Sequence, residues 1–322
     1  MITRAKSFVA LIAFTLLLPG CALTPGMGLS KDGADALAAN GAQSEARTIK
    51  TEIGPITLGL LPNKHKASDL ASFESEMGIQ FLQIQGQTLP AKVDLRSYFT
   101  PVRNQGALGS CAAFATTSAM EATIAIKGRK APKASTLSPL FFYYATRKEM
   151  QDTGRMAKAT KRDTGSFMDV AARVAVKVGA AAEATTPYVD GKAGLAYDAS
   201  QAEYDEAKAY KQIKMSRVSS VKGMKSALAS NHPIIFGVPL YDSFMTKAMA
   251  QTGEMPLPGR SESVIGGHAM TMVGYDDAKQ AFLVRNSWGK DWGQQGYFYM
   301  PYDFFKPAYI GTSSYFECYV FE

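Results

Sequence analysis

The sequence predicts an α+β fold, because segments with helical patterns come first in the larger part of the chain and strand-like segments follow. Helices are expected roughly between residues 100 and 215, and antiparallel strands roughly between residues 216 and 322. From residue 90 onward the chain is long enough to bury a large core or two half-cores. A site built from both halves would lie in the cleft between them.

Five segments carry helix signals. Ser138 followed by Pro139 is a cap with a first-turn proline, and Ser200 with Glu203 has the spacing of a capping box. Gly128 stands where the first of these helices would stop. The expected helices are residues 112–127, 140–150, 166–178, 200–210 and 219–229.

Strand-like segments dominate the second half of the chain. A turn at residues 276–277 separates two of them, which would pair as a hairpin. Nearer the amino terminus, residues 49–61 predict a short strand pair and residues 67–77 a short amphipathic helix. The expected strands of the second half are residues 233–240, 269–275, 281–285, 297–300 and 315–321.

Cys111 follows a Gly-Ser turn and stands on the first turn of the first expected helix. Unpaired N–H groups and the positive end of the helix dipole favour thiolate there, so the pKa of the thiol is expected to be low. Cys111 is therefore a candidate nucleophile. The alternative is a buried structural cysteine that happens to begin a helix.

A thiolate nucleophile needs a base, and that base needs a group that orients it. The chain has only three histidines. His65 lies in a linker-like stretch rich in proline and lysine, and His232 lies at a turn, whereas His268 opens a β-rich stretch. Asn286 is near the end of the partner strand, where its amide could accept a ring N–H bond from His268.

Three sequence blocks, residues 105–114, 267–269 and 286–289, resemble those of the papain-like cysteine peptidases in order and separation. The resemblance covers residues 89–322. It implies a fold of two subdomains, a helical half and an antiparallel, β-barrel-like half, with the active-site cleft between them. Further similar stretches are residues 89–96, 137–139, 186–188 and 292–297.

The resemblance implies a role for each matching residue. Cys111 would be the nucleophile, His268 the general acid and base, and Asn286 its orienter. Gln105 would donate its side-chain N–H to the oxyanion, together with the backbone N–H of Cys111. Trp288 would cover the hydrogen bond between the imidazole and the amide. A turn residue at Gln105 and a core aromatic at Trp288 are the alternatives.

The chain also departs from the family pattern. Leu108 stands where the family usually has a cysteine, and the region of its partner has none, so that disulfide is not expected. Residues 163–166 replace a stretch with two adjacent glycines that pairs with substrate backbone. Gly165 is the first candidate there for a substrate contact and Ser166 the second. Gly267 precedes the histidine where many relatives have a polar residue, and it is a third candidate.

The first 20 residues resemble a signal peptide, with a basic start and an apolar run too short for the ~20 residues that span a bilayer. The stretch 18–21 looks like a bacterial lipoprotein processing site, although Pro19 is unusual there. Cys21 would then carry lipid. The resemblance implies export and anchoring at the bacterial cell envelope, at its periplasmic face or outer membrane, and a secreted product is the alternative.

Residues 21–88 are expected to form a lipidated tether that includes a propeptide-like segment. Residues 22–48 have too few large apolar groups to order themselves. Residues 49–88 lie where relatives carry an inhibitory propeptide, but they are short and lack its long helical pattern. Our hypothesis is that part of residues 49–88 occupies the cleft before activation; a spacer from the membrane is the alternative.

Charge and cysteine usage narrow the partners. The net charge of +7 resides beyond residue 91, and basic stretches at 147–162 and 208–225 would favour acidic substrates or anionic lipid, unless they are simply solvated faces. No nucleic-acid motif or zinc-ligand spacing is present, so no cofactor, metal or nucleic-acid partner is expected. We expect a monomer. Cys318 would be a small core residue, or alternatively a second reactive thiol.

These observations together predict a thiol-dependent endopeptidase that cleaves proteins or peptides through an acyl-enzyme. One rival uses the same thiolate to transfer an acyl group or to cleave a non-protein amide. A second rival is a catalytically silent binding module on the same fold. Retention of Gln105, Cys111, His268 and Asn286 together argues against the silent module.

Overall fold

The computed structural model describes residues 45–63, 80–81, 88–128, 136–310 and 314–322. The expected signal peptide, the lipidation site Cys21, most of the tether and the helix expected at residues 67–77 lie outside the described residues. Within the described part of the chain, no helix is long and apolar enough to cross a membrane.

The predicted helices are present, with their signals in use. Ser138 caps its helix by accepting a hydrogen bond from the backbone N–H of Phe141, and Ser200 and Glu203 form the predicted capping box. The α-helices are α3 (Cys111–Ile126), α4 (Pro139–Asp152), α5 (Met168–Lys177), α6 (Gly191–Leu195), α7 (Gln201–Ala207), α8 (Val221–Ala229), α9 (Lys247–Thr252) and α10 (Pro307–Ile310). Short 3-10 helices are η1 (Arg96–Tyr98), η2 (Ala159–Lys161), η3 (Lys208–Tyr210), η4 (Asp242–Met245) and η5 (Tyr302–Phe305).

Eight of the described strands form one large sheet. Its order is β3-β5-β10-β6-β7-β8-β9, with β4 pairing with β7, and every pairing is antiparallel except the parallel pair β3–β5. The strands are β3 (Gln80–Phe81), β4 (Lys92–Asp94), β5 (Met215–Arg217), β6 (Ile234–Tyr241), β7 (Val264–Asp276), β8 (Ala281–Arg285), β9 (Tyr297–Pro301) and β10 (Glu317–Phe321).

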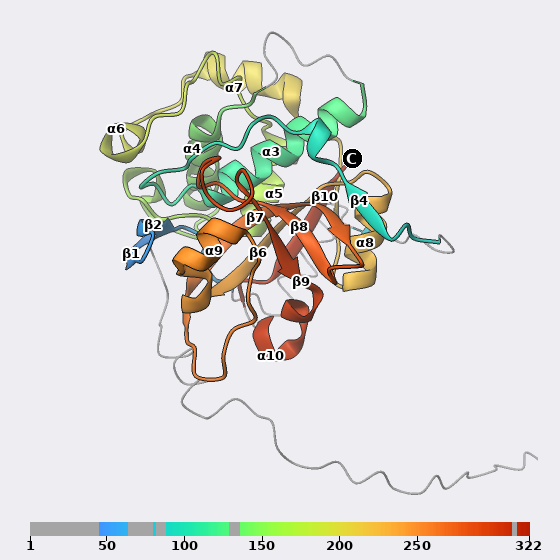
Figure 1. Ribbon diagram of the computed structural model, residues 1–322. Helices are drawn as coiled ribbons and strands as arrows, with labels where there is room; N and C mark the ends of the chain where they lie inside the picture. Colours follow the sequence, from blue (N-terminus) through green and yellow to red (C-terminus); the bar gives the residue numbers. More distant parts are fainter. Residues whose placement is uncertain (1–44, 64–79, 82–87, 129–135, 311–313) are drawn as a thin grey trace, which may run out of the picture.

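The expectation of a β-barrel-like half is corrected by this topology. In the described residues the sheet stays open, because no pairing joins β9 back to β3. Helices α3 to α7 lie on one side of the molecule, and the sheet with α8, α9 and α10 lies on the other (Figure 1). The predicted α+β fold, with a helical part packed on an antiparallel part, is confirmed.

Two elements differ from the prediction for local reasons. Helix α5 begins at Met168 and not at residue 166, because Ser166 uses its backbone in an isolated strand bridge with Leu60, and the next residue is extended. Strand β7 begins at Val264, several residues before the expected start, because its first part pairs with β6 as far as Tyr241. Glycine is uncommon in strands, so the two glycines in that part of β7 hid the strand pattern in the sequence.

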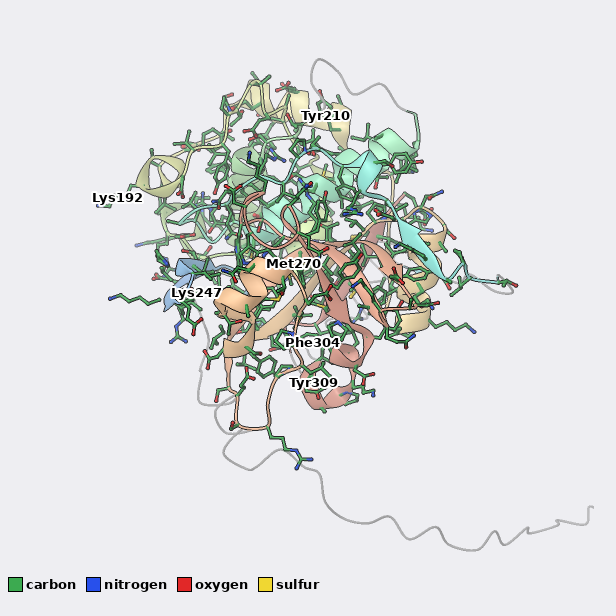
Figure 2. All side chains as sticks on the ribbon, in the orientation of Figure 1. Lys192, Tyr210, Lys247, Met270, Phe304 and Tyr309 are labelled. Carbon is green, nitrogen blue, oxygen red and sulfur yellow. The ribbon has the colours of Figure 1, made fainter. Side chains whose placement is uncertain are left out.

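Helix α3 forms the centre of the helical half. Its residues from Cys111 to Ile124 are buried on all sides, which its small Ala, Thr and Ser side chains allow because neighbouring elements can approach closely. A second core fills the sheet half and includes Met270, which Figure 2 labels near its centre. Cys318 lies fully buried on β10 within this second core, and it is a free thiol, as is Cys111.

The predicted strand pair at the amino-terminal side is a hairpin of β1 (Arg47–Thr51) and β2 (Gly54–Leu58). It lies at the boundary between the helical half and the sheet half (Figure 1). Hydrogen bonds connect the hairpin and its preceding residue to both halves. The backbone N–H of Ala46 donates to the backbone oxygen of Asp163 at 2.8 Å, and the Glu52 carboxylate accepts from the backbone N–H of Lys247 at 3.1 Å.

Candidate active site

Cys111 is the first residue of α3 and is fully buried. Burial raises the pKa of its thiol to about 11, although backbone N–H groups of Ala269, Gly59 and Ala112 face the sulfur and oppose that rise. This corrects the expected lowering of the pKa. Cys111 does begin a helix, as the sequence predicts. However, the loss of hydration destabilises the buried thiolate more than the nearby N–H groups stabilise it.

His268 lies on β7 and is also fully buried. Its Nε2 is 2.8 Å from Oδ1 of Asn286, which follows the last residue of β8, so the predicted hairpin brings the two side chains together. Its Nδ1 has no hydrogen-bond partner among the described residues. Burial lowers the pKa of His268 to about 4, against the opposing bond with Asn286. A neutral imidazole that donates from Nε2 fits these contacts.

An aromatic cluster closes the site on the sheet side. The Trp288 ring lies 5.0 Å from the imidazole of His268, centroid to centroid, at an interplanar angle of 31°. Phe244 and Trp292 pack edge-on against Trp288 at 5.7 and 5.2 Å. Trp288 therefore lies over the imidazole, where the sequence placed it, and its neighbours hold it there.

Gln105 is buried beside the amino terminus of α3, with its amide fixed on both ends. Its Oε1 accepts from the Ser287 hydroxyl at 2.6 Å, and its Nε2 donates to the backbone oxygens of Leu108 at 2.9 Å and Thr57 at 3.1 Å. Ser287 was missed as a site residue. Its position directly after Asn286 was the available signal, because residues that neighbour an orienting amide lie within reach of the same cleft.

Tyr188 supports Gln105 from the helical half. Its hydroxyl donates to the Gln105 backbone oxygen at 2.7 Å and lies 2.8 Å from the hydroxyl of Ser110, the residue before Cys111. Burial raises the pKa of Tyr188, so its hydroxyl stays protonated and can donate.

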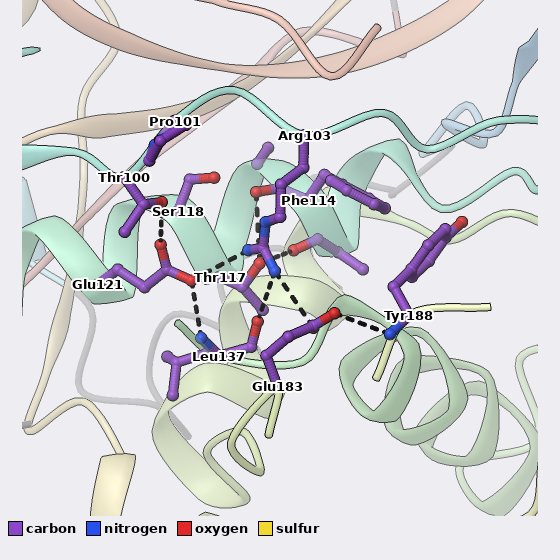
Figure 3. Close-up of polar contacts among 12 residues, drawn as sticks. Thr100, Pro101, Arg103, Phe114, Thr117, Ser118, Glu121, Leu137, Glu183 and Tyr188 are labelled. Atoms are coloured by element: carbon purple, nitrogen blue, oxygen red, sulfur yellow. Dashed lines mark hydrogen bonds and ion pairs between the residues drawn. The ribbon is translucent and has the colours of Figure 1, made fainter. Parts of the chain in front are cut away.

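A partly buried charge network, centred on the buried Glu121, lies behind this loop (Figure 3). The Arg103 guanidinium donates to Glu121 at 3.0 Å and to Glu183 at 3.2 Å, and Glu183 accepts from the backbone N–H of Tyr188 at 2.8 Å. Glu121 also accepts from the Thr100 hydroxyl and from a backbone N–H at 2.8 Å. Burial raises the pKa of Glu121, and the charge of Arg103 opposes that rise. The loop that carries Gln105 is thus held by paired, desolvated charges.

A second, half-buried carboxylate joins the nucleophile loop to the opposite wall. Asp163 accepts from the backbone N–H of Gly109 at 3.1 Å and from the Tyr143 hydroxyl, and that hydroxyl accepts from the backbone N–H of Gly165 at 2.9 Å. Burial raises the pKa of Asp163, and its hydrogen bonds from Tyr143 and Gly109 oppose the rise. Sequence reasoning named residues 163–166 without finding this role, because the partners are distant in the chain.

A part of the amino-terminal segment lies across this site. The backbone oxygen of Thr57 accepts from Gln105, and the backbone N–H of Gly59 faces the Cys111 sulfur. Leu60 donates its backbone N–H to the backbone oxygen of Gly267 at 3.3 Å. The described cleft is therefore filled by this chain's own backbone.

The three candidate substrate-binding residues have different contacts with that segment. On the helical wall, Ser166 makes two backbone hydrogen bonds with the segment: its N–H donates to the Gly59 oxygen at 2.8 Å, and its oxygen accepts from the Leu61 N–H at 3.0 Å. Gly165 makes neither, but a Cβ there would lie 2.0 Å from the Gly59 oxygen, so it leaves the room that the segment needs. Gly267 contributes its backbone oxygen to Leu60. Among the described residues, no group of three potential metal ligands converges.

The sequence profile described as papain family cysteine protease matches residues 89–316. The chain belongs to this family. The matched region contains both walls of the cleft, whereas the segment at residues 57–61 lies before it.

Individual relatives agree with this membership. The chain is 32% identical over 212 residues to an uncharacterized peptidase C1-like protein of Acanthamoeba polyphaga mimivirus, covering 62% of this chain and 64% of that protein. It is 31% identical over 222 residues to cathepsin S of Bos taurus, covering 66% and 60%. The match thus spans about three fifths of the length of these curated relatives.

Solved structures of papain-family proteins share the fold. Xylellain, a cysteine protease from Xylella fastidiosa, is 28% identical with a TM-score of 0.69, over 86% of this chain and 97% of that one. The digestive procathepsin L 3 of Tenebrio molitor larval midgut is 18% identical with a TM-score of 0.56, over 91% and 90%, and shows the fold alone.

Proposed function

We propose that this chain is a thiol-dependent endopeptidase that hydrolyses protein or peptide substrates through an acyl-enzyme on Cys111. The observation that carries the proposal is the junction of the two halves. The Cys111 sulfur faces the backbone N–H of Ala269, the residue after His268, while Asn286 holds the far nitrogen of the imidazole. This arrangement supports Cys111 as the nucleophile, His268 as its base and Asn286 as the orienter of that base.

The chemistry follows from these positions. His268 Nδ1, which has no partner among the described residues, would take the thiol proton as the Cys111 sulfur attacks a peptide carbonyl. Gln105 Nε2 and the Cys111 backbone N–H would stabilise the oxyanion. The imidazolium would then protonate the leaving amine, and a water activated by His268 would hydrolyse the thioester. The Gln105 Nε2 group already binds one carbonyl oxygen, that of Thr57, and this contact supports its proposed role as a donor to the oxyanion.

We further propose that residues 57–61 keep the enzyme inactive until they leave the cleft. Gly59 covers the sulfur and Thr57 occupies the side-chain donor of Gln105, so no substrate carbonyl can reach either group. Both titratable groups are desolvated in this closed form, which favours a neutral thiol and a neutral imidazole. Opening would admit water and lower the pKa of Cys111.

The signal peptide and the lipid anchor predicted for the amino-terminal residues are part of the same proposal. Export, lipidation of Cys21 and anchoring of a monomeric enzyme at the cell envelope are supported by the sequence pattern. Metabolic labelling with an alkyne fatty acid in a bacterial host would test the anchor. We expect label in the membrane fraction for the natural chain and none for Cys21→Ser; label retained by Cys21→Ser would contradict the proposal.

The catalytic proposal is tested by a mixed peptide library under reducing conditions, read by mass spectrometry, with the open variant Gly59→Ala, in which a Cβ would lie 2.0 Å from the Gly109 backbone oxygen, and with Cys111→Ala in the same background. A thiol-directed epoxide traps the nucleophile in parallel, and Cys318→Ala is the control for the other described thiol. We expect cleavage and labelling that vanish in Cys111→Ala and persist in Cys318→Ala. Transfer of acyl groups to added amines without hydrolysis would instead favour the acyl-transfer rival.

A further inference from the structure

The end of the cleft-bound segment inserts a polar side chain between two oppositely charged groups. Asn63 Nδ2 donates to the Glu317 carboxylate at 3.1 Å, and Asn63 Oδ1 accepts from the Arg155 guanidinium at 3.0 Å. Asn63 is 9% exposed and Glu317 is 6% exposed. Both halves of the carboxamide are therefore satisfied inside the protein and not by bulk water.

The two protein partners are themselves fixed in place. The Arg155 guanidinium forms an ion pair with buried Asp169 and lies over the Phe167 ring at 4.1 Å. Glu317 begins β10, where it pairs with Gly237 of β6, and it also accepts from the Tyr319 hydroxyl at 3.3 Å. A rigid carboxylate and a rigid guanidinium thus face each other across the Asn63 amide.

This pair of groups is continuous with the substrate cleft. Phe167 directly follows Ser166, whose backbone binds Leu61, and Asn63 lies two residues farther along the same bound segment. The backbone N–H of Asn63 donates to the backbone oxygen of Ser314 at 2.6 Å, just before β10. When the segment leaves, Glu317 and Arg155 face the vacated end of the cleft.

We propose that Glu317 and Arg155 form a substrate subsite selective for a side-chain carboxamide, so that the peptidase prefers asparagine or glutamine at one position several residues away from its cleavage site. The proposal rests on the proposed function and names a substrate class for it. The chemistry is complementary: a carboxylate takes the NH₂ half and a guanidinium donates to the oxygen half.

The same pair would exclude charged side chains. An aspartate there would pair one oxygen with Arg155 but place the other against the Glu317 carboxylate, and a lysine or arginine would pair with Glu317 but place its cation against Arg155, so each charged side chain meets one like charge that a carboxamide does not. A leucine would replace neither of the hydrogen bonds that Asn63 now makes, although Arg155 keeps its ion pair with Asp169 and Glu317 keeps its bond from Tyr319. Selectivity therefore arises from like-charge repulsion and from hydrogen bonds that other side chains do not replace, as much as from attraction.

The first test uses the full chain and needs no catalysis. The rate of Cys111 alkylation by iodoacetamide reports how often the segment leaves the cleft. Asn63→Asp should label about tenfold faster than the natural chain, because its carboxylate meets Glu317, and Asn63→Asp with Glu317→Gln should return toward the natural rate. Glu322→Gln, at the other end of β10, is the matched control and should label at the natural rate. Equal rates for Asn63→Asp and the natural chain would overturn the carboxamide pocket.

The second test reads substrate preference in an open enzyme. A Cβ on Gly59 would lie 2.0 Å from the Gly109 backbone oxygen, so in the full chain we expect Gly59→Ala to displace residues 57–61 from the cleft. We expect this variant to cleave a peptide library with asparagine and glutamine enriched at one position and aspartate depleted there about tenfold. Adding Glu317→Gln should admit aspartate at that position.

Cleavage without any carboxamide preference would overturn the subsite. No cleavage by Gly59→Ala at all would count against the proposed function, while the alkylation rates would still decide whether the pocket selects a carboxamide. Labelling at Cys111 but not at buried Cys318, located by mass spectrometry, and a cooperative thermal transition confirm that each variant is folded.

Discussion

The two walls of the cleft are held by different forces. On the sheet wall, His268 and Gly267 lie on β7, and Asn286 follows β8, so backbone ladders β6–β7–β8 position them. On the helical wall, Gln105 and Ser166 lie in loops, and buried side chains position those loops. A backbone ladder tolerates most single side-chain changes, whereas a loop held by a few buried charges depends on each of them.

The charges behind the helical wall give the largest expected effect. Arg103→Leu leaves the Glu121 carboxylate buried without its cation. Removal of one partner from a fully buried pair costs about 3–5 kcal/mol of unfolding free energy, and because the Arg103 side chain is 21% exposed we expect a loss at the lower end, about 3 kcal/mol. Arg96→Leu breaks the exposed pair with Asp94 and should cost less than about 1 kcal/mol. Urea unfolding of both variants measures the difference. Equal losses would remove the distinction between the two kinds of ion pair.

Acid should weaken the sheet wall through His268. Its pKa is about 4 in the folded chain against 6.5 for a free imidazole, so between these values the unfolded chain binds the extra proton. The stability contributed by the neutral imidazole is present above pH 6.5 and is lost as the pH falls toward 4, a change of about 3 kcal/mol. Unfolding at several pH values checks this, and His268→Gln should flatten the profile in that window. If unfolding free energy depends on pH equally steeply in His268→Gln, the effect arises from another group.

The link between the nucleophile loop and the opposite wall can be weakened without disturbing the core. Asp163→Asn keeps the shape but removes the charge that accepts from Gly109 and Tyr143, so we expect kcat/KM in the open Gly59→Ala background to fall about tenfold. Asp198→Asn is the control, because Asp198 also accepts a tyrosine hydroxyl but does so through Tyr144, with no contact to the cleft loops. A similar loss in both would mean that general stability, not loop position, is responsible.

The smallest effect is expected where the two walls meet through one neutral bond. The Thr271 hydroxyl on β7 donates to the backbone oxygen of Ala115 on α3 at 2.9 Å. Thr271→Val conserves the volume and should cost about 1 kcal/mol of unfolding free energy, with activity of the open enzyme within about twofold. Thermal unfolding and peptide hydrolysis measure both. A large loss of activity would show that the ladder alone does not hold this wall.

The same contrast explains what the sequence could predict. The hairpin that brings Asn286 to His268 follows from two strand patterns and a turn, and Cys111 at a helix start follows from local signals. The pairing of Asp163 with Gly109, or of Glu121 with Arg103, joins residues far apart in the chain, and no local pattern encodes it. The prediction of a low pKa for the Cys111 thiol was wrong for the same reason, because the burial that raises it depends on the whole fold.

The propeptide hypothesis rested on position and on patches of apolar residues, and it named residues 49–88 without identifying which residue would lie at the Cys111 sulfur. Gly59 could not have been singled out, because its role depends on how closely it approaches Gly109 and Gly165. Likewise the barrel-like half was expected from the resemblance, whereas closure depends on whether the edge strands meet. Local patterns specify elements, and long-range contacts specify the site.

The central claim is that a complete thiol site lies under residues 57–61. Initial rates of peptide hydrolysis by freshly purified natural chain, by Gly59→Ala, and by Gly59→Ala with Cys111→Ala test it most directly. Gly259→Ala, on an exposed loop with ordinary contacts, is the matched control. The account predicts that Gly59→Ala hydrolyses peptides at least about tenfold faster than the natural chain and Gly259→Ala, and that the Cys111→Ala combination is inactive. Equal initial rates for the natural chain and Gly59→Ala, or hydrolysis that survives loss of Cys111, would contradict it.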